Sequence, residues 1–200
     1  FPTRRSSDLP VFALDGGVAT ASAAVNWARG LGLFDGWEEI SHFDRPPAIA
    51  RGLAFVPALA GLAAPHWDRN AKGAWLGLTL NTTKADMMQA LLEGVAFRMA
   101  EVMAEMPARA DAPVSIDGGM SRNPWFCQFL ADALGSPIRV SEEPELTALG
   151  CAQLSAKGAG RDLTFAPKAR LVTPRPMPQL WRARFRAARE AVQGYGAACA

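Results

Sequence analysis

The segment that most constrains the fold is a short strand candidate that leads through two glycines into a helix. Residues 113–116 carry the strand pattern, and Asp117-Gly118-Gly119 follow them directly. Asn123 is a favoured helix N-cap, Pro124 suits the first helical position, and Gly135 predicts the helix end. A further strand over 138–140 completes a strand–helix–strand unit, which is typical of a crossover onto a parallel sheet. The sequence therefore predicts an α/β fold.

The rest of the chain extends this alternation. Thr83 with Asp86 predicts a helix start, and apolar residues at helical spacing continue from Met88 to Met103. The other predicted elements, in chain order, are a strand over 11–14, a helix over 18–31, a surface excursion over 35–50, a strand over 53–57, a loop over 61–73, a strand over 74–79, a helix over 146–156 and a tail helix from about 180. We expect the arginines of the tail helix, residues 182, 184, 186 and 189, to lie on a solvated face rather than against an acidic partner.

Charge and cysteine content exclude several classes. Lysine and arginine number 21 against 19 aspartates and glutamates, so the net charge of +2 gives no reason to expect a nucleic-acid or membrane-surface partner. The three cysteines show no CxxC spacing, which argues against a disulfide framework or a cysteine zinc site and favours a reducing cytoplasm. No apolar run approaches the roughly 18 residues that a membrane span requires.

The first ten residues differ in character from the rest of the chain. FPTRRSSDLP is polar, lacks an apolar core and resembles translated adaptor DNA, so we expect residues 1–10 to be a non-native leader. We expect a nucleotide-binding domain over 11–165 and a tail with an amphipathic helix over 166–200.

The double glycine suggests a class of ligand. Two missing side chains let a flat molecule approach the backbone, and the start of the following helix favours anions. Together these features suit a nucleotide, although a strand–Gly-Gly–helix turn alone is ordinary in α/β proteins. Neither a Walker A loop nor a GxGxxG fingerprint is present.

Four further blocks together resemble one family. They are residues 56–79, with Ala63-Ala64-Pro65-His66-Trp67-Asp68 at their centre, and Leu91-Leu92-Glu93-Gly94-Val95-Ala96-Phe97, Asp117-Gly118-Gly119 and Thr147-Ala148-Leu149-Gly150. In order and spacing they resemble the C-terminal domain of FGGY carbohydrate kinases, within that family most nearly the glycerol kinases. The resemblance implies an actin-like ATPase (ribonuclease H-like) domain with a mixed sheet flanked by helices.

The resemblance also implies site residues and cofactors. It places Gly119 against adenine and the α-phosphate of ATP, with Gly118 beside it and Asn123 helping to hold the nucleotide. Ser22 and Asn26, just before a tryptophan, stand where the family has a glycine and a glutamine, so both depart from the pattern. The implied cofactors are ATP and Mg²⁺. The family's catalytic aspartate would lie upstream of Val11, so we expect no catalytic residue and no metal ligand here, and no turnover by this chain alone.

Three functions stay open. The first is glycerol kinase, converting glycerol and ATP to glycerol 3-phosphate and ADP. The second is xylulokinase or another sugar kinase of the family, which His66 and Ser22 favour. The third is a non-catalytic actin-like nucleotide-binding module. The expected partners are a small polyol or sugar and a missing N-terminal kinase domain, and homo-oligomer formation is left open. We expect His66 to pack in its loop, since no partner that would make it a base is evident, and Asp68 not to be catalytic.

Overall fold

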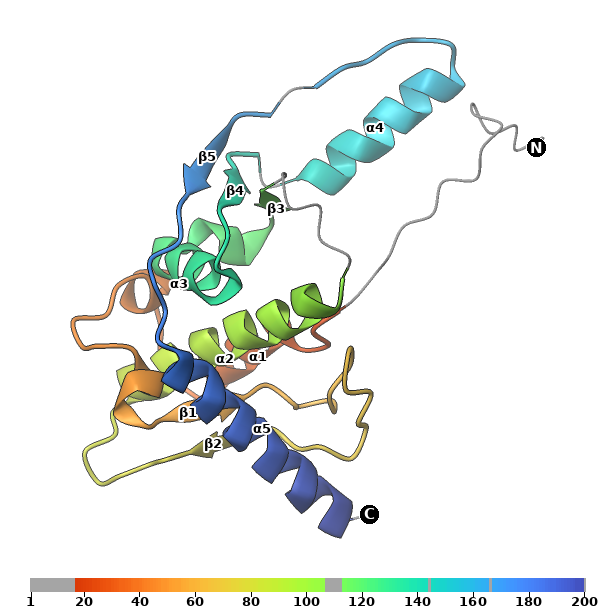
Figure 1. Cartoon of the computed structure of the whole chain (residues 1–200). Coiled ribbons are helices and arrows are strands. Elements are labelled where there is room, and N and C mark those ends of the chain that lie inside the picture. The colour runs from red at the N-terminus through yellow and green to blue at the C-terminus, as the bar shows by residue number, and fades with distance from the viewer. Residues whose placement is uncertain (1–16, 107–112, 144, 166, 200) are drawn as a thin grey trace.

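A computed structural model describes residues 17–106, 113–143, 145–165 and 167–199 (Figure 1). The helices are α1 (Ala21–Gly30), α2 (Lys84–Glu105), α3 (Pro124–Leu134), α4 (Leu146–Gly158) and α5 (Gln179–Ala198), with single 3₁₀ turns η1 (Trp37–Ile40), η2 (Ala48–Arg51) and η3 (Gly119–Arg122). The strands are β1 (Ala54–Val56), β2 (Ala74–Leu76), β3 (Val114–Ile116), β4 (Ile138–Ser141) and β5 (Ala169–Val172). The predicted leader and the strand predicted over 11–14 lie outside the described residues.

The strands form two sheets. β1 and β2 make an antiparallel pair, and the second sheet has the order β3-β4-β5. Within it β3 and β4 are parallel, as the strand–helix–strand pattern predicts, while β5 joins β4 antiparallel. The mixed sheet and its helices confirm the α/β class. β5 was not predicted, because its four residues carry little pattern of their own and three of them are exposed.

Helix α2 runs through the centre of the molecule, between α3 and the β1–β2 pair (Figure 1). Its start matches the prediction: Thr83 Oγ1 accepts from the backbone N–H of Asp86, whose carboxylate accepts from that of Thr83. Gly94 lets the helix lie against β1, since a Cβ there would stand only 2.0 Å from the carbonyl oxygen of Phe55. The match of this glycine to the family pattern therefore has a packing cause.

The interpretation of residues 35–50 as a surface excursion is confirmed only in part, since many of them are exposed but three are buried. Ile40, Ala48 and Ile49 are buried, and the segment turns twice, at η1 and η2, while it packs on α2. The strand predicted over 74–79 also ends early, at Leu76.

The expectation of a solvated arginine face on the tail helix was wrong for two of its members. Arg189 is buried, and its Nε donates to a carboxylate oxygen of Glu101 on α2 at 3.0 Å. Arg184 Nη1 donates to the backbone carbonyls of Ile49 and Ala50, at 2.9 and 2.7 Å. These arginines fasten α5 to the body.

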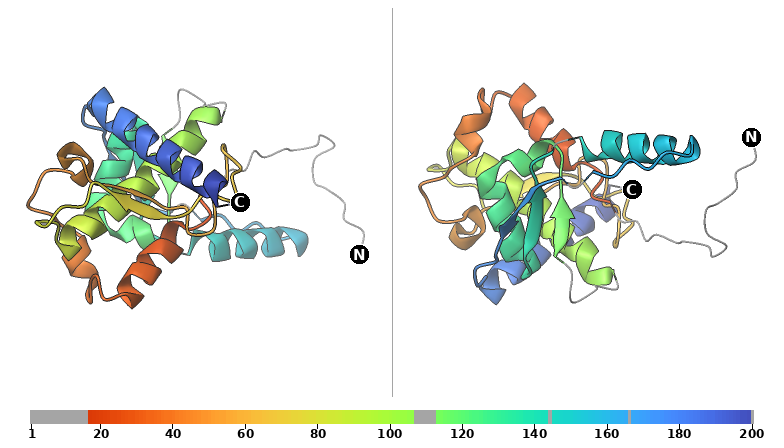
Figure 2. Two further views of the ribbon diagram at one scale, coloured as in Figure 1. Left: turned by 90° about the horizontal axis from the view of Figure 1, so that it is seen from below. Right: turned by 90° about the horizontal axis from the view of Figure 1, so that it is seen from above.

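Helix α4 stands apart from the other elements. It projects from the body in both views of Figure 2, and none of its residues is buried. Its start at Leu146 was predicted, and it ends at Gly158. Within the described part of the chain, no helix combines the length and apolar character needed to cross a bilayer.

Candidate functional site

A pocket of about 540 Å³ opens between α1, η1, the middle of α2 and the turn that leads into α3. Its lining comes from segments about 100 residues apart in sequence. The residues are Ser22, Val25, Asn26, Trp37, Ile40, Ser41, Leu92, Gly119, Met120, Arg122 and Asn123. Four of the five predicted site residues are among them; the fifth, Gly118, lies next to the lining.

Ser22 and Asn26 reach the pocket because α1 is anchored on its other faces. Both are exposed and lie one helical turn apart, with Val25 buried between them. The neighbouring Trp27 stacks on Trp75, with 5.6 Å between ring centroids. These contacts fix the rotation of α1, so its polar positions 22 and 26 form one pocket wall.

The two glycines of the turn have different roles within the chain. Gly118 has φ 83° and ψ −174°, a conformation open almost only to glycine, and its carbonyl accepts from Ser121 Oγ at 2.7 Å. Gly119 has no such backbone demand, and a Cβ there would meet no atom of the described residues within 4 Å. Nothing in the described part of the chain therefore requires a glycine at 119. Because Gly119 has no side chain, the pocket wall at this position is open to a ligand.

Asn123 joins two walls of the pocket. Its Oδ1 accepts from the backbone N–H of Phe126 at 2.9 Å, which makes it the N-cap of α3 as predicted. Its Nδ2 donates to the backbone carbonyl of Ile40 in η1 at 2.7 Å. The acceptor oxygen and one amide hydrogen are thus engaged within the protein, so Asn123 holds η1 against the start of α3.

The electrostatic character of the pocket suits a ligand with a flat apolar part and a negative charge. Val25, Leu92 and Met120 supply apolar surface. Among the described lining residues there is no carboxylate, and Arg122 is the only one with a full charge. An anionic ligand would therefore meet one positive charge and no carboxylate among these lining residues.

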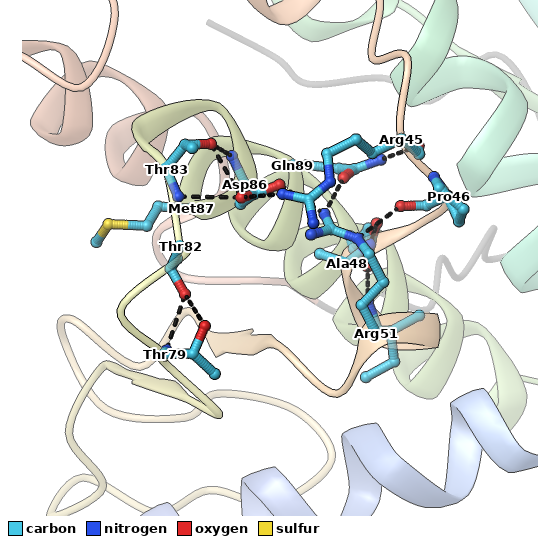
Figure 3. A network of polar contacts seen from close by, with 12 residues as sticks. Arg45, Pro46, Ala48, Arg51, Thr79, Thr82, Thr83, Asp86, Met87 and Gln89 are labelled. Atoms are coloured by element: carbon cyan, nitrogen blue, oxygen red, sulfur yellow. Dashed lines mark hydrogen bonds and ion pairs between the residues drawn. The ribbon is translucent and has the colours of Figure 1, made fainter.

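The segment that follows η1 and leads through η2 is held by a row of polar side chains on α2. Asp86, Gln89 and Glu93 lie three and four residues apart and are all buried. The carboxylate of Asp86 pairs with Arg45 at 2.7 Å and with Arg51 at 2.8 Å (Figure 3). Burial alone would raise the pKa of Asp86, but the hydrogen bonds from Thr83 and the charge of Arg51 outweigh it and lower that pKa.

Glu93 completes this row at the start of η2. Its Oε1 accepts from the backbone N–H of Ala48 at 2.6 Å and its Oε2 from that of Ile49 at 2.8 Å. The residue is only 2% exposed, and burial raises the pKa of its carboxyl group to about 8. Glu93 thus satisfies two N–H groups at the start of η2 and holds residues 48–51 against helix α2.

His66 has a partner that sequence reasoning missed. Its Nε2 lies 3.2 Å from Oε2 of Glu101, a carboxylate that Arg98 and Arg189 also contact. Burial and the charge of Arg189 lower the pKa of His66, against the effect of Glu101. Neither residue lines the pocket. Asp68 is structural as well, because its Oδ1 accepts from the backbone N–H groups of Asn70 and Ala71 at 2.9 and 3.1 Å.

Trp37, Ile40, Ser41 and Arg122 line the pocket and were not predicted as site residues. The first three belong to the segment interpreted as a surface excursion. One local signal was available: Asp35-Gly36 followed by Glu39 resembles a capped helical start, and Glu39 Oε1 does accept from both preceding backbone N–H groups.

Comparison with known proteins gives consistent results. The model of the C-terminal domain of the FGGY family of carbohydrate kinases matches residues 2–159. Glycerol kinase of Thermus brockianus is 42% identical over 179 residues, which cover 87% of this chain and 34% of that protein. The structure of Plasmodium falciparum glycerol kinase with ADP superposes with a TM-score of 0.67 and 28% identity, covering 88% of this chain and 37% of the other. Gluconate kinase from Lactobacillus acidophilus gives a TM-score of 0.67 and 26% identity, over 91% and 39% of the two chains. The chain thus spans about a third of the length of the relatives it matches.

Proposed function

Because this chain belongs to the FGGY family of carbohydrate kinases and matches their C-terminal domain, we propose that it forms the nucleotide-binding side of an ATP-dependent polyol kinase. Within the family we propose glycerol kinase activity, the transfer of the γ-phosphoryl group of ATP to glycerol. The 42% identity to a glycerol kinase supports this choice.

One observation carries the proposal. Ser22, Asn26, Gly119 and Asn123, which the family resemblance selects as nucleotide-contacting positions, all line the same 540 Å³ pocket. They come from two segments separated by more than 90 residues. A volume of this size accommodates a small-molecule ligand of nucleotide dimensions. The glycerol kinase of Plasmodium falciparum, which shares this fold, was determined with ADP.

Two features of the pocket support a nucleotide as its ligand. The open wall at Gly119 allows close approach, and Arg122 offers a charge to the phosphates. Among the described residues no three histidine, cysteine, aspartate or glutamate side chains converge as a metal cage. Mg²⁺ is therefore expected to arrive with the phosphate oxygens, as is usual for this ion. The residues of this chain bind and orient the nucleotide.

The remaining parts of the reaction would come from an N-terminal kinase domain. Phosphoryl transfer to an alcohol needs a group that accepts the hydroxyl proton and a surface that orients the alcohol. We assign the aspartate base and the polyol pocket to that domain, and we expect the two domains to close around the nucleotide and exclude water. We expect the enzyme to act in the cytoplasm.

The comparisons with relatives and with solved structures point to different acceptor alcohols for the phosphoryl group. The relatives by sequence include glycerol kinases, whereas the structural neighbours include a gluconate kinase and a xylulose kinase. His66, which favours xylulokinase in the sequence, lies outside the pocket and pairs with Glu101. We therefore keep xylulose as the second candidate acceptor.

A coupled assay of ADP release tests the proposal. The protein is expressed together with its upstream coding sequence and assayed with glycerol, xylulose and gluconate, and the 200-residue chain alone serves as the control. We expect turnover that depends on glycerol in the longer protein and none in the chain alone. Turnover with xylulose only would keep the kinase and change its substrate. ADP binding without turnover on any polyol would favour a non-catalytic nucleotide-binding module.

A further inference from the structure

Trp37 is a large aromatic side chain placed at the edge of the pocket. It is the first residue of η1, it lines the cavity, and it is 50% exposed. Indole rings usually gain most of their stabilising energy from burial, whereas half of this one stays in solvent. An exposed ring at a pocket edge suggests that a ligand covers it.

The ring is held in position by two neighbours. Phe34, which is buried, meets it edge to face, with 5.4 Å between centroids and 62° between planes. The guanidinium of Arg29 lies over the ring, 5.4 Å from its centroid. Trp37 itself lines the pocket and is half exposed, so the part of the indole that these neighbours leave uncovered borders the cavity.

The backbone that carries Trp37 is held equally firmly. Glu39 Oε1 accepts from the backbone N–H groups of Gly36 at 2.7 Å and Asp35 at 3.1 Å, and these bonds lower the pKa of Glu39. Three residues beyond Trp37, the carbonyl of Ile40 accepts from Asn123. The turn therefore presents the indole in one position before any ligand arrives, which reduces the entropy lost on binding.

We propose that Trp37 stacks on the base of the bound nucleotide and is a main determinant of affinity for it. The indole offers a flat π surface, while Val25, Leu92 and Met120 offer apolar contact to the rest of the base. Stacking is strong for any base and strongest for the larger purines, which matches an adenine nucleotide. This inference rests on the proposed function, because it assumes that the pocket takes a nucleotide.

The test is a calorimetric titration of the 200-residue chain with ADP and, separately, with inorganic pyrophosphate. The variants are Trp37→Leu, Trp37→Phe and, as the matched control, Trp67→Leu, which removes a 74% exposed indole outside the pocket. We expect Trp37→Leu to weaken ADP binding roughly tenfold, a typical loss for one stacking contact. Trp37→Phe should restore most of that loss, and Trp67→Leu should bind ADP as wild type does. Pyrophosphate has no base, so its affinity should be the same in all four proteins.

The outcomes separate this inference from the proposed function. If wild type binds ADP and Trp37→Leu binds it equally well, the stacking role is wrong and the nucleotide pocket stands. If Trp37→Leu loses ADP and pyrophosphate affinity together, the residue supports the fold of the site rather than the base, and the inference is overturned. If wild type binds no ADP at millimolar concentration, the proposed function fails and this inference fails with it.

Discussion

The side-chain amide of Asn123 donates to the backbone carbonyl of Ile40 at 2.7 Å, across 83 residues of sequence. This hydrogen bond joins the turn that carries Trp37 to the start of α3. The same side chain caps α3 through the N–H of Phe126. One residue therefore sets the distance between two walls of the proposed nucleotide pocket.

Replacing Asn123 by serine should remove the first contact and keep the second. Serine caps helices about as well as asparagine, but its side chain is too short to reach Ile40. We expect Asn123→Ser to lower the free energy of unfolding by about 0.5–1.5 kcal/mol, the usual net value of one hydrogen bond. Asn123→Ala should cost about 1 kcal/mol more, because the cap is lost too. Urea denaturation of both variants measures this, and equal losses would contradict the separate roles.

Glu93 should make stability depend on pH in an unusual direction. Its carboxyl group has a pKa raised by burial from 4.5 to about 8. Between these two values the folded state holds a proton that the unfolded state has released, so stability falls as pH rises. Below about pH 4.5 both states are protonated, and the contribution is fully present.

The test compares wild type with Glu93→Gln in urea denaturation at several pH values from about 5 to 8. Glutamine cannot ionise, so the variant should lack this part of the pH dependence and show a flatter profile. In the variant, the side-chain NH₂ group of glutamine would face the backbone N–H of Ala48 or Ile49, so two donors would meet with no acceptor between them. The variant should therefore be less stable than wild type at about pH 5. If the two stability profiles were parallel, the ionisation of Glu93 would not be the cause of the pH dependence of stability.

Gly94 should tolerate no side chain. An added Cβ would lie 2.0 Å from the carbonyl oxygen of Phe55, and this contact is with backbone, which cannot move aside locally. We expect Gly94→Ala to destabilise the chain by about 3 kcal/mol or more, at the upper end of overpacking costs. The matched control is Gly150→Ala in the projecting helix α4, where a Cβ meets nothing within 4 Å. That change should be stabilising by about 0.5–1 kcal/mol, since alanine is the better helix former. Thermal unfolding that ranks the two variants the other way round would refute the packing argument.

The elements that could be predicted from sequence are those whose signals are local. The N-cap pairs at Thr83 and Asn123, and the stop at Gly135, depend on neighbours within four residues, and they appear as expected. The pocket positions 22, 26, 119 and 123 came from a family resemblance, because no local pattern links segments about 100 residues apart.

The predictions that failed concern side chains whose partners lie far away in the sequence. Residues 35–50 are polar, yet they pack on α2 because Asp86, Gln89 and Glu93 supply partners from 41 to 45 residues away. Arg189 is similarly paired with a carboxylate 88 residues earlier in the chain. From composition alone such side chains are predicted to be exposed to solvent, because the local sequence pattern contains no information on partners at that distance.

We propose that the pocket wall at Gly119 faces a nucleotide. The measurement that tests this most directly is a calorimetric titration of the Gly119→Ala chain with ADP. The unfolding midpoint of the same variant is measured beside it. A Cβ at 119 meets no atom within 4 Å among the residues that the structure describes, so the midpoint should change little. Gly118→Ala should be destabilising by about 1 kcal/mol or more because of its positive φ. We expect wild type to bind ADP and Gly119→Ala to bind it at least roughly tenfold more weakly, since the methyl group takes space from the ligand. Equal ADP affinity in the two proteins would contradict the placement of the nucleotide against this turn.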